Sequence, residues 1–194
     1  MQGVIGYRMR PLAQPTAILK DRPFRATFEE FTVSGDSRSV TARGLFLRDA
    51  AGDTRTEFFD GSGQRSRTVV LDARTEGAFY ILHLDPRAGM KVPSQHKTEN
   101  TFKWTFDGSD LVEVGEDKVS GMSCRRYRVL NPQGDFTTEV CISDLLQAVL
   151  QEKTLSKEGV YVWELRDIST DAPAKDLFRP PANFTVLSPD IPRQ

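Results

Sequence analysis

Apolar and polar residues alternate along this chain in short runs, and Gly, Pro, Asn and Asp residues separate the runs. The alternating runs are residues 24–33, 40–48, 54–60, 68–71, 79–84, 90–92, 102–106, 111–119, 124–141 (a hairpin) and 161–165. Turns that recur about every 8 to 12 residues are typical of an antiparallel all-β meander. The pattern therefore predicts a mainly β protein with little helix.

The first of these runs changes its phase. In residues 24–33 the apolar positions are even-numbered up to Phe28 and odd-numbered from Phe31 onwards. Because successive side chains of a strand point to opposite faces, such a change indicates an inserted residue. We therefore predict a β-bulge near Glu29 and Glu30.

Residues 145–153 are ambiguous. Ser143 and Asp144 could cap a helix whose apolar residues form one stripe. The alternation of Leu146, Ala148 and Leu150 supports a strand equally well. The local pattern leaves both interpretations open.

Cys124 and Cys141 are the only cysteines, and they lie symmetrically about the turn signal at residues 131–134. If the two cysteines face each other in a hairpin, Arg126 faces Glu139, and Cys, Arg, Glu and Thr residues collect on one face. A free buried pair is the alternative. The register favours a cross-strand disulfide, and therefore a protein that matures in an oxidising compartment.

Length and charge narrow the classes of function. A chain of 194 residues suits one β domain, expected at residues 23–187, with an extended segment at 1–22 and a tail at 188–194. The net charge of −1 argues against nucleic acid and against a broadly anionic membrane surface as partners. No apolar run approaches the about 20 residues of a membrane span, and no export signal is visible. The opening Met1-Gln2-Gly3 suggests a mature sequence from which such a signal was removed.

No catalytic constellation, metal-ligand spacing or cofactor motif appears, so we predict neither an enzyme nor a bound metal or cofactor. His83 is expected to be a solvent-facing or hydrogen-bonded strand residue, and His96 lies in a polar loop. Glu113, Glu116 and Asp117 could in principle serve a hydrolase, but solvated strand faces and turns explain such carboxylates more simply.

Aromatic residues gather on alternating strand faces. They could form an ordinary core, or they could line the concave face of a curved sheet that accommodates a lipid or acyl chain. The residues that we predict to contact such a ligand are Phe28, Phe46, Trp104, Phe106, Tyr127, Phe136, Tyr161 and Trp163.

Four segments together resemble one family. They are residues 44–57 with the sequence GLFLRDAAGDTRTE, 82–87 with LHLDPR, 119–127 with VSGMSCRRY, and 176–184 with DLFRPPANF. In this order they are similar to uncharacterised secreted bacterial proteins whose fold is like that of the outer-membrane lipoprotein carrier LolA. The resemblance spans about residues 23–187.

The resemblance implies a half-open antiparallel barrel or strongly curved sheet with an apolar concavity, in a periplasmic or secreted protein. It also favours a strand at residues 145–153. We therefore expect a non-enzymatic envelope protein that binds a lipid, an acyl chain or a lipoprotein. The alternative is a periplasmic interaction or stress-sensing module that binds an envelope protein without lipid. LolA has helices that plug its cavity, and this chain offers little helix to do so.

Overall fold

The structure is a computed structural model that describes residues 14–15, 21–60, 62–93, 104–105, 110–130, 136–156 and 159–188. Its strands are β1 (Gln14–Pro15), β2 (Phe24–Ser34), β3 (Ser37–Arg48), β4 (Thr54–Phe59), β5 (Arg65–Ala73), β6 (Ala78–Leu84), β7 (Arg87–Pro93), β8 (Trp104–Thr105), β9 (Asp110–Val119), β10 (Met122–Leu130), β11 (Phe136–Ser143), β12 (Ala148–Ser156), β13 (Gly159–Ser169) and β14 (Thr185–Leu187). Two short 3₁₀ helices, η1 (Arg74–Glu76) and η2 (Lys175–Phe178), complete the elements of these ranges.

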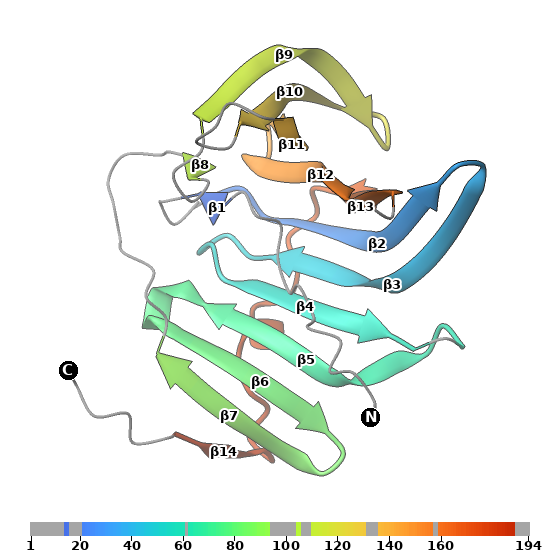
Figure 1. Cartoon of the computed structure of the whole chain (residues 1–194). Coiled ribbons are helices and arrows are strands. Elements are labelled where there is room, and N and C mark those ends of the chain that lie inside the picture. Colours follow the sequence, from blue (N-terminus) through green and yellow to red (C-terminus); the bar gives the residue numbers. More distant parts are fainter. Residues whose placement is uncertain are drawn as a thin grey trace, which may run out of the picture.

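Twelve strands form one sheet in the order β14-β7-β6-β5-β4-β3-β2-β13-β12-β11-β10-β9. Neighbouring strands are antiparallel, except that β14 runs parallel to β7. The strands β1 and β8 pair with each other in a separate small sheet. The large sheet does not close, because β9 and β14 are its two ends (Figure 1). The prediction of a mainly β, mostly antiparallel and strongly curved sheet is confirmed.

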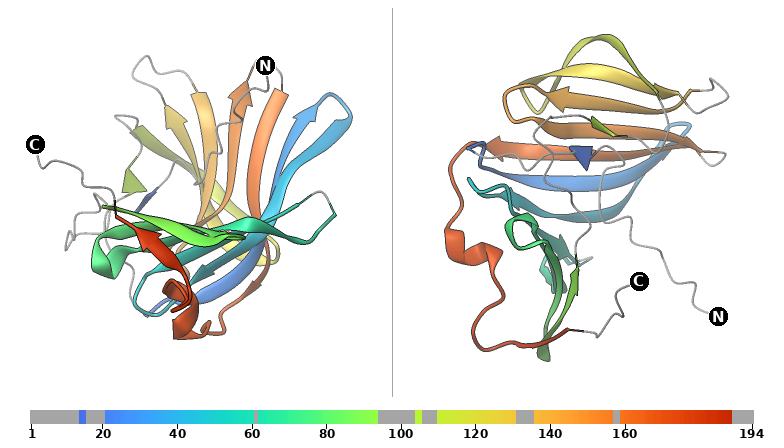
Figure 2. Two further views of the ribbon diagram at one scale, coloured as in Figure 1. Left: turned by 90° about the horizontal axis from the view of Figure 1, so that it is seen from below. Right: turned by 90° about the vertical axis from the view of Figure 1, so that its left-hand side faces the viewer.

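The sheet bends so that β4–β7 lie across the end of a second group made of β2, β3 and β9–β13 (Figure 2). In β2 the side chains of Phe24, Ala26 and Phe28 point to the concave face and are buried. Glu29 and Phe31 alternate with them and therefore point to the convex face. The larger core cluster gathers on the concave side of β2, β11, β12 and β13.

A second core lies on the convex side of β5 and β6. Its buried members are Val69, Leu71, Ala73, Ala78, Tyr80 and Leu82, with Phe184 and Val186 packed against them. The segment that follows β13 crosses this side of the sheet and ends in β14 (Figure 2). Phe178 of η2 is fully buried, so this segment is fastened by an apolar anchor.

Ionic contacts also hold the C-terminal segment. The carboxylate of Asp53 accepts hydrogen bonds from the backbone and hydroxyl of Thr75 at 2.9 and 2.8 Å, and from Arg179 at 3.1 Å. Arg179 also pairs with Glu76 at 3.1 Å. Arg55 donates to the carbonyl of Leu177 at 2.8 Å. Because Asp53 is buried, its three donors replace the water that an isolated carboxylate would need.

The predicted bulge lies beside Glu30, as expected, but the extra residue belongs to β3 and not to β2. β2 pairs with β13 without interruption from Val33 to Thr27, whereas the pairing with β3 skips Thr41. Phe31 therefore lies on the convex face because of ordinary alternation. There the guanidinium of Arg38 covers its ring at 3.9 Å, which shields an apolar side chain on the outer surface.

The ambiguous segment at residues 145–153 is a turn followed by a strand. β11 ends at Ser143, the chain turns at residues 144–147, and β12 begins at Ala148. The hydroxyl of Ser143 accepts a hydrogen bond from the backbone N–H of Leu146 at 3.3 Å. The predicted capping residue thus supports a turn rather than a helix, and the strand interpretation is correct from Ala148 onwards.

Cys124 and Cys141 form the predicted disulfide, with Cα atoms 5.5 Å apart. The predicted register is wrong by two residues, because Arg126 pairs with Cys141 and Arg128 pairs with Glu139. The cysteines therefore bond diagonally across the hairpin. A slip of two residues leaves every side chain on its predicted face, so period-two alternation could not reveal it.

We expect the double variant Cys124→Ala/Cys141→Ala to fold but to lose about 3 kcal/mol of unfolding free energy, because the disulfide closes a loop between residues 17 apart. Guanidinium denaturation of the oxidised wild type and of the variant measures the loss. Reductant should lower the midpoint of the wild type and leave that of the variant unchanged. Equal midpoints for the oxidised wild type and the variant would contradict the prediction.

Candidate functional site

The concave face of the central strands is lined by aromatic side chains. The ring of Phe28 lies 6.3 Å from that of Trp163 in a stacked arrangement, and Leu165 is paired opposite Phe28. Phe46 of β3 lies on the same face, with its ring 5.6 Å from that of Phe24. These contacts join β2, β3 and β13 into one apolar surface.

The concave side of β4–β7 bears further apolar residues that the sequence analysis did not select. Phe58 of β4 meets Phe28 edge to face at 5.6 Å. Ile81 of β6 and Met90 of β7 are paired neighbours on the concave side, and Met90 is 45% exposed. We call the combined surface the concave apolar face: Phe28, Phe46, Phe58, Ile81, Met90, Tyr127, Tyr161 and Trp163. Phe58, Ile81 and Met90 could be assigned to this face only from the pairing register of the strands, which a single sequence does not provide.

The predicted ligand-contacting aromatics differ in their surroundings. Phe28 and Trp163 are buried in the core. Phe46, Tyr127 and Tyr161 are partly buried and pack against that core. Trp104 and Phe136 begin strands β8 and β11, but their side chains lie outside the described part of the chain, as does the whole of Phe106. Five of the eight candidates are therefore brought to one continuous face.

Glu152 is an acidic residue of β12 on the concave side, and sequence analysis missed it. It is buried, and it pairs with Trp163 on one side and Val140 on the other. A carboxylate between two apolar neighbours requires local compensation, so this position is a buried polar feature of the concave side.

Arg48 fastens a turn to one end of the concave face. It is buried and donates to the carbonyls of Arg22 at 2.9 Å, Gln147 at 3.2 Å and Leu146. Its guanidinium also lies 4.7 Å from the centre of the Phe24 ring. Burial lowers the pKa of Arg48 to about 9, and the charges of Arg74 and Arg22 act in the same direction. Arg48 thus remains protonated at neutral pH and can satisfy three carbonyl groups at once.

A shallow, open cleft of about 490 Å³ lies beside this turn. Its lining residues are Asp21, Arg22, Pro23, Leu145, Leu146 and Thr170. None of the predicted aromatics borders it, so it is separate from the concave apolar face.

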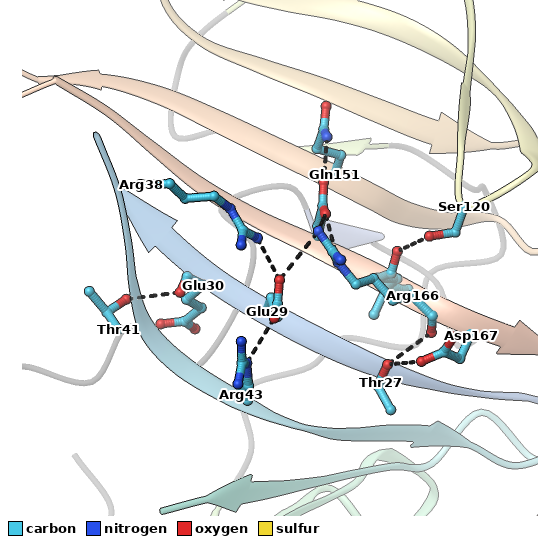
Figure 3. Close-up of polar contacts among 12 residues, drawn as sticks. Thr27, Glu29, Glu30, Arg38, Thr41, Arg43, Ser120, Gln151, Arg166 and Asp167 are labelled. Carbon is cyan, nitrogen blue, oxygen red and sulfur yellow. Dashed lines mark hydrogen bonds and ion pairs between the residues drawn. The ribbon is translucent and has the colours of Figure 1, made fainter. Parts of the chain in front are cut away.

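The convex face bears an ionic network across β3, β2, β13 and β12 (Figure 3). Arg38 and Arg43 bond the two oxygens of Glu29 at 2.5 and 2.8 Å, and Arg166 lies 3.3 Å from the same carboxylate. Arg166 also bonds Glu164 at 2.5 and 2.8 Å. We call Arg38, Arg43 and Arg166 the convex arginine cluster.

The arginines determine the protonation of Glu29. Partial burial raises the pKa of this carboxyl, but the hydrogen bonds from Arg38 and Arg43 and the charge of Arg166 outweigh burial. The pKa of Glu29 is therefore lowered. The carboxylate stays ionised at neutral pH and holds the three guanidinium groups at fixed positions.

Of the titratable candidates from the sequence analysis, His96 lies outside the described residues, and Asp117, Glu113 and His83 have identifiable partners. Asp117 bonds Arg126, and Glu113 lies 3.8 Å from Arg125, so both belong to ion pairs at the edge strand β9. His83 is exposed, as predicted, and its Nδ1 lies 3.4 Å from the hydroxyl of Thr68. Among the described residues, no three His, Cys, Asp or Glu side chains cluster as a metal site would require.

Comparison with solved structures identifies the fold. The chain matches an uncharacterised conserved protein from Thermus thermophilus with a TM-score of 0.56 and 15% identity, over 86% of this chain and 90% of that one. It also matches the Pseudomonas aeruginosa MucA/MucB complex structure, with a TM-score of 0.51 and 17% identity over 84% of this chain. The match spans only 57% of the length of that chain.

LolA superfamily proteins are also among the structural neighbours. One from Nitrosomonas europaea aligns over 84% of this chain and 93% of its own, with a TM-score of 0.39 and 9% identity. No protein-family model and no curated protein matches the chain. At these identities the similarity defines the fold alone. In the part of the chain that the structure describes, no helix is both long and apolar enough to cross a membrane.

We expect Arg48→Met to lower the unfolding free energy by about 2 to 4 kcal/mol, because three buried or partly buried carbonyl groups lose their donor. Arg87→Met, at the exposed arginine that begins β7, is the matched control and should change stability by less than about 0.5 kcal/mol. Urea denaturation measures both. Equal stability of the two variants would show that the carbonyl contacts do not hold the turn.

Proposed function

We propose that this chain is a non-enzymatic envelope protein that binds an apolar ligand on its concave apolar face. The ligand class is a lipid, an acyl chain or a lipidated partner. The observation that supports this most directly is the exposure of Met90 on the concave side of β7, where it keeps 45% of its surface exposed. Exposed apolar surface that adjoins a concave wall is the usual chemistry of an apolar binding site.

The disulfide supports the proposed location. A bond between Cys124 and Cys141 persists in oxidising compartments such as the bacterial periplasm or the cell exterior. The likeness of the fold to MucB, whose solved complex contains MucA, agrees with an envelope protein that binds a partner. On these grounds we assign the chain to the periplasm or the cell surface.

Ligand binding to the native form should raise the melting temperature of delipidated protein. At a ligand concentration of about 100 Kd the gain is about 2.7 kcal/mol, or about 5 to 10 °C for a domain of this size. Fatty acid, lysophospholipid and lipopeptide are the probes, followed by scanning fluorimetry. Met90→Glu should abolish the shift, because it places a charge on the concave apolar face.

Leu155→Glu is the matched control, because Leu155 is 47% exposed and lies on the convex face. Its ligand-induced shift should equal that of the wild type. The proposal fails if none of the three amphiphiles shifts the wild type, or if Met90→Glu and Leu155→Glu respond alike.

A second function is favoured by the likeness to MucB, which was solved in complex with MucA. In this alternative the chain is an interaction or stress-sensing module that binds a protein on its convex face, without lipid cargo. The polar convex network and the apolar concave face use opposite sides of the same strands. The two functions are therefore physically compatible.

Crosslinking in a native envelope extract tests the second function. We expect one stoichiometric protein partner, crosslinked to residues of the convex face, in both the wild type and Met90→Glu. Co-purifying lipid without a protein would favour the first function. A partner that is lost in Met90→Glu would place protein binding on the concave apolar face and contradict the convex location.

A further inference from the structure

The convex arginine cluster presents positive charge outward and keeps its carboxylates beneath. The side chains of Arg38, Arg43 and Arg166 are 41%, 57% and 43% exposed, whereas those of Glu29 and Glu164 are only 12% and 15% exposed. At these three positions an approaching molecule therefore meets guanidinium groups before it meets the carboxylates of Glu29 and Glu164. Thr27 holds Asp167, the exposed carboxylate that follows Arg166, through a hydrogen bond of 2.8 Å.

The arginines retain unused donors. Each guanidinium has five N–H groups in a rigid fork. Within the network, Arg38 and Arg43 each direct one nitrogen to Glu29, and Arg166 directs two to Glu164. No residue of the described part of the chain accepts from the remaining donors of these half-exposed groups, so they can bond carboxylates from outside. Such charge-assisted contacts are among the strongest hydrogen bonds in proteins.

Glu29 also reduces the cost of binding. Long arginine side chains normally lose rotamer freedom when they bind a partner. Here Glu29 already orders three of them from strands on both sides of β2, as Figure 3 shows. A ligand would gain the contacts without ordering the side chains anew.

We propose that the convex arginine cluster binds an extended acidic segment of a partner protein, with carboxylates on alternate residues. The inference rests on the second proposed function and names the chemistry of its partner. The backbones of β3 and β13 lie about 10 Å apart on either side of β2, and carboxylates on alternate residues of an extended chain lie about 7 Å apart. Because the guanidinium groups of Arg43 and Arg166 both converge on Glu29, they lie closer together than the backbones of their strands, so two carboxylates can bind at once. A second copy of this chain is disfavoured as occupant, because two such clusters repel each other.

Isothermal titration with an acetylated (Glu-Thr)₄ peptide at low salt tests the proposal. We expect saturable binding that weakens about tenfold in Arg43→Gln/Arg166→Gln, because two exposed charge contacts are lost. The charge-matched control Arg87→Gln/Lys175→Gln removes two exposed cations elsewhere and should bind as the wild type does. A (Gln-Thr)₄ peptide should not bind. Arg43→Gln alone removes one contact from the most exposed arginine, so it is the second variant if the double variant misfolds.

Four results would overturn the inference. The first is that the acidic peptide fails to bind, and the second is that its binding weakens equally in the cluster and control variants. The third is that the glutamine peptide binds as tightly as the acidic one, and the fourth is that the cluster binds inorganic phosphate or anionic phospholipid vesicles in place of the peptide. Failure of this titration together with a crosslinked protein partner would reject only the acidic chemistry. Failure of both experiments would reject the second function as well.

Discussion

The bend of the sheet depends on the close approach of Phe28 to Gly44. A Cβ atom at residue 44 would lie 2.0 Å from the carbonyl oxygen of Glu57 and 2.4 Å from the Phe28 ring. Only glycine allows β2, β3 and β4 to come this near to one another. Phe58 then meets Phe28 edge to face, and the aromatic surface turns the corner from the central strands to β4–β7.

The period-two alternation of the chain was sufficient to predict the fold class, the disulfide pairing and the faces of the hairpin strands. It was insufficient for register, because a slip of two residues leaves Arg126 and Glu139 on the same face and changes only their partners. The bulge was assigned to β2 because Phe31 is apolar. In the structure Phe31 is covered by Arg38, and the alternation of apolar and polar residues does not predict such a contact.

Long-range contacts explain why part of the site escaped prediction. The arginines of the convex cluster come from β3 and β13 and meet Glu29 on β2. One of them, Arg166, is 137 positions from Glu29 in the sequence. The carbonyls that Arg48 binds at residues 146 and 147 are nearly 100 positions distant. Phe178 was recognised as part of a motif, but its burial depends on the course of the whole C-terminal segment. Local sequence propensity cannot predict such long-range contacts, since each contact depends on the order of the strands in the completed sheet.

Adjacent residues of β2 serve opposite faces of the molecule. Phe28 belongs to the concave apolar face, and Glu29 holds the convex arginine cluster. A ligand that altered the curvature around Phe28 would therefore alter the spacing of guanidinium groups on β3 and β13, because all three strands share one hydrogen-bonded sheet. Any such coupling between the two faces would be reciprocal, since an acidic partner would favour the same curvature that favours its ligand. The two strands that flank β2 are arranged in the same way, since β3 carries Phe46 and Arg43 on opposite faces, and β13 carries Trp163 and Arg166.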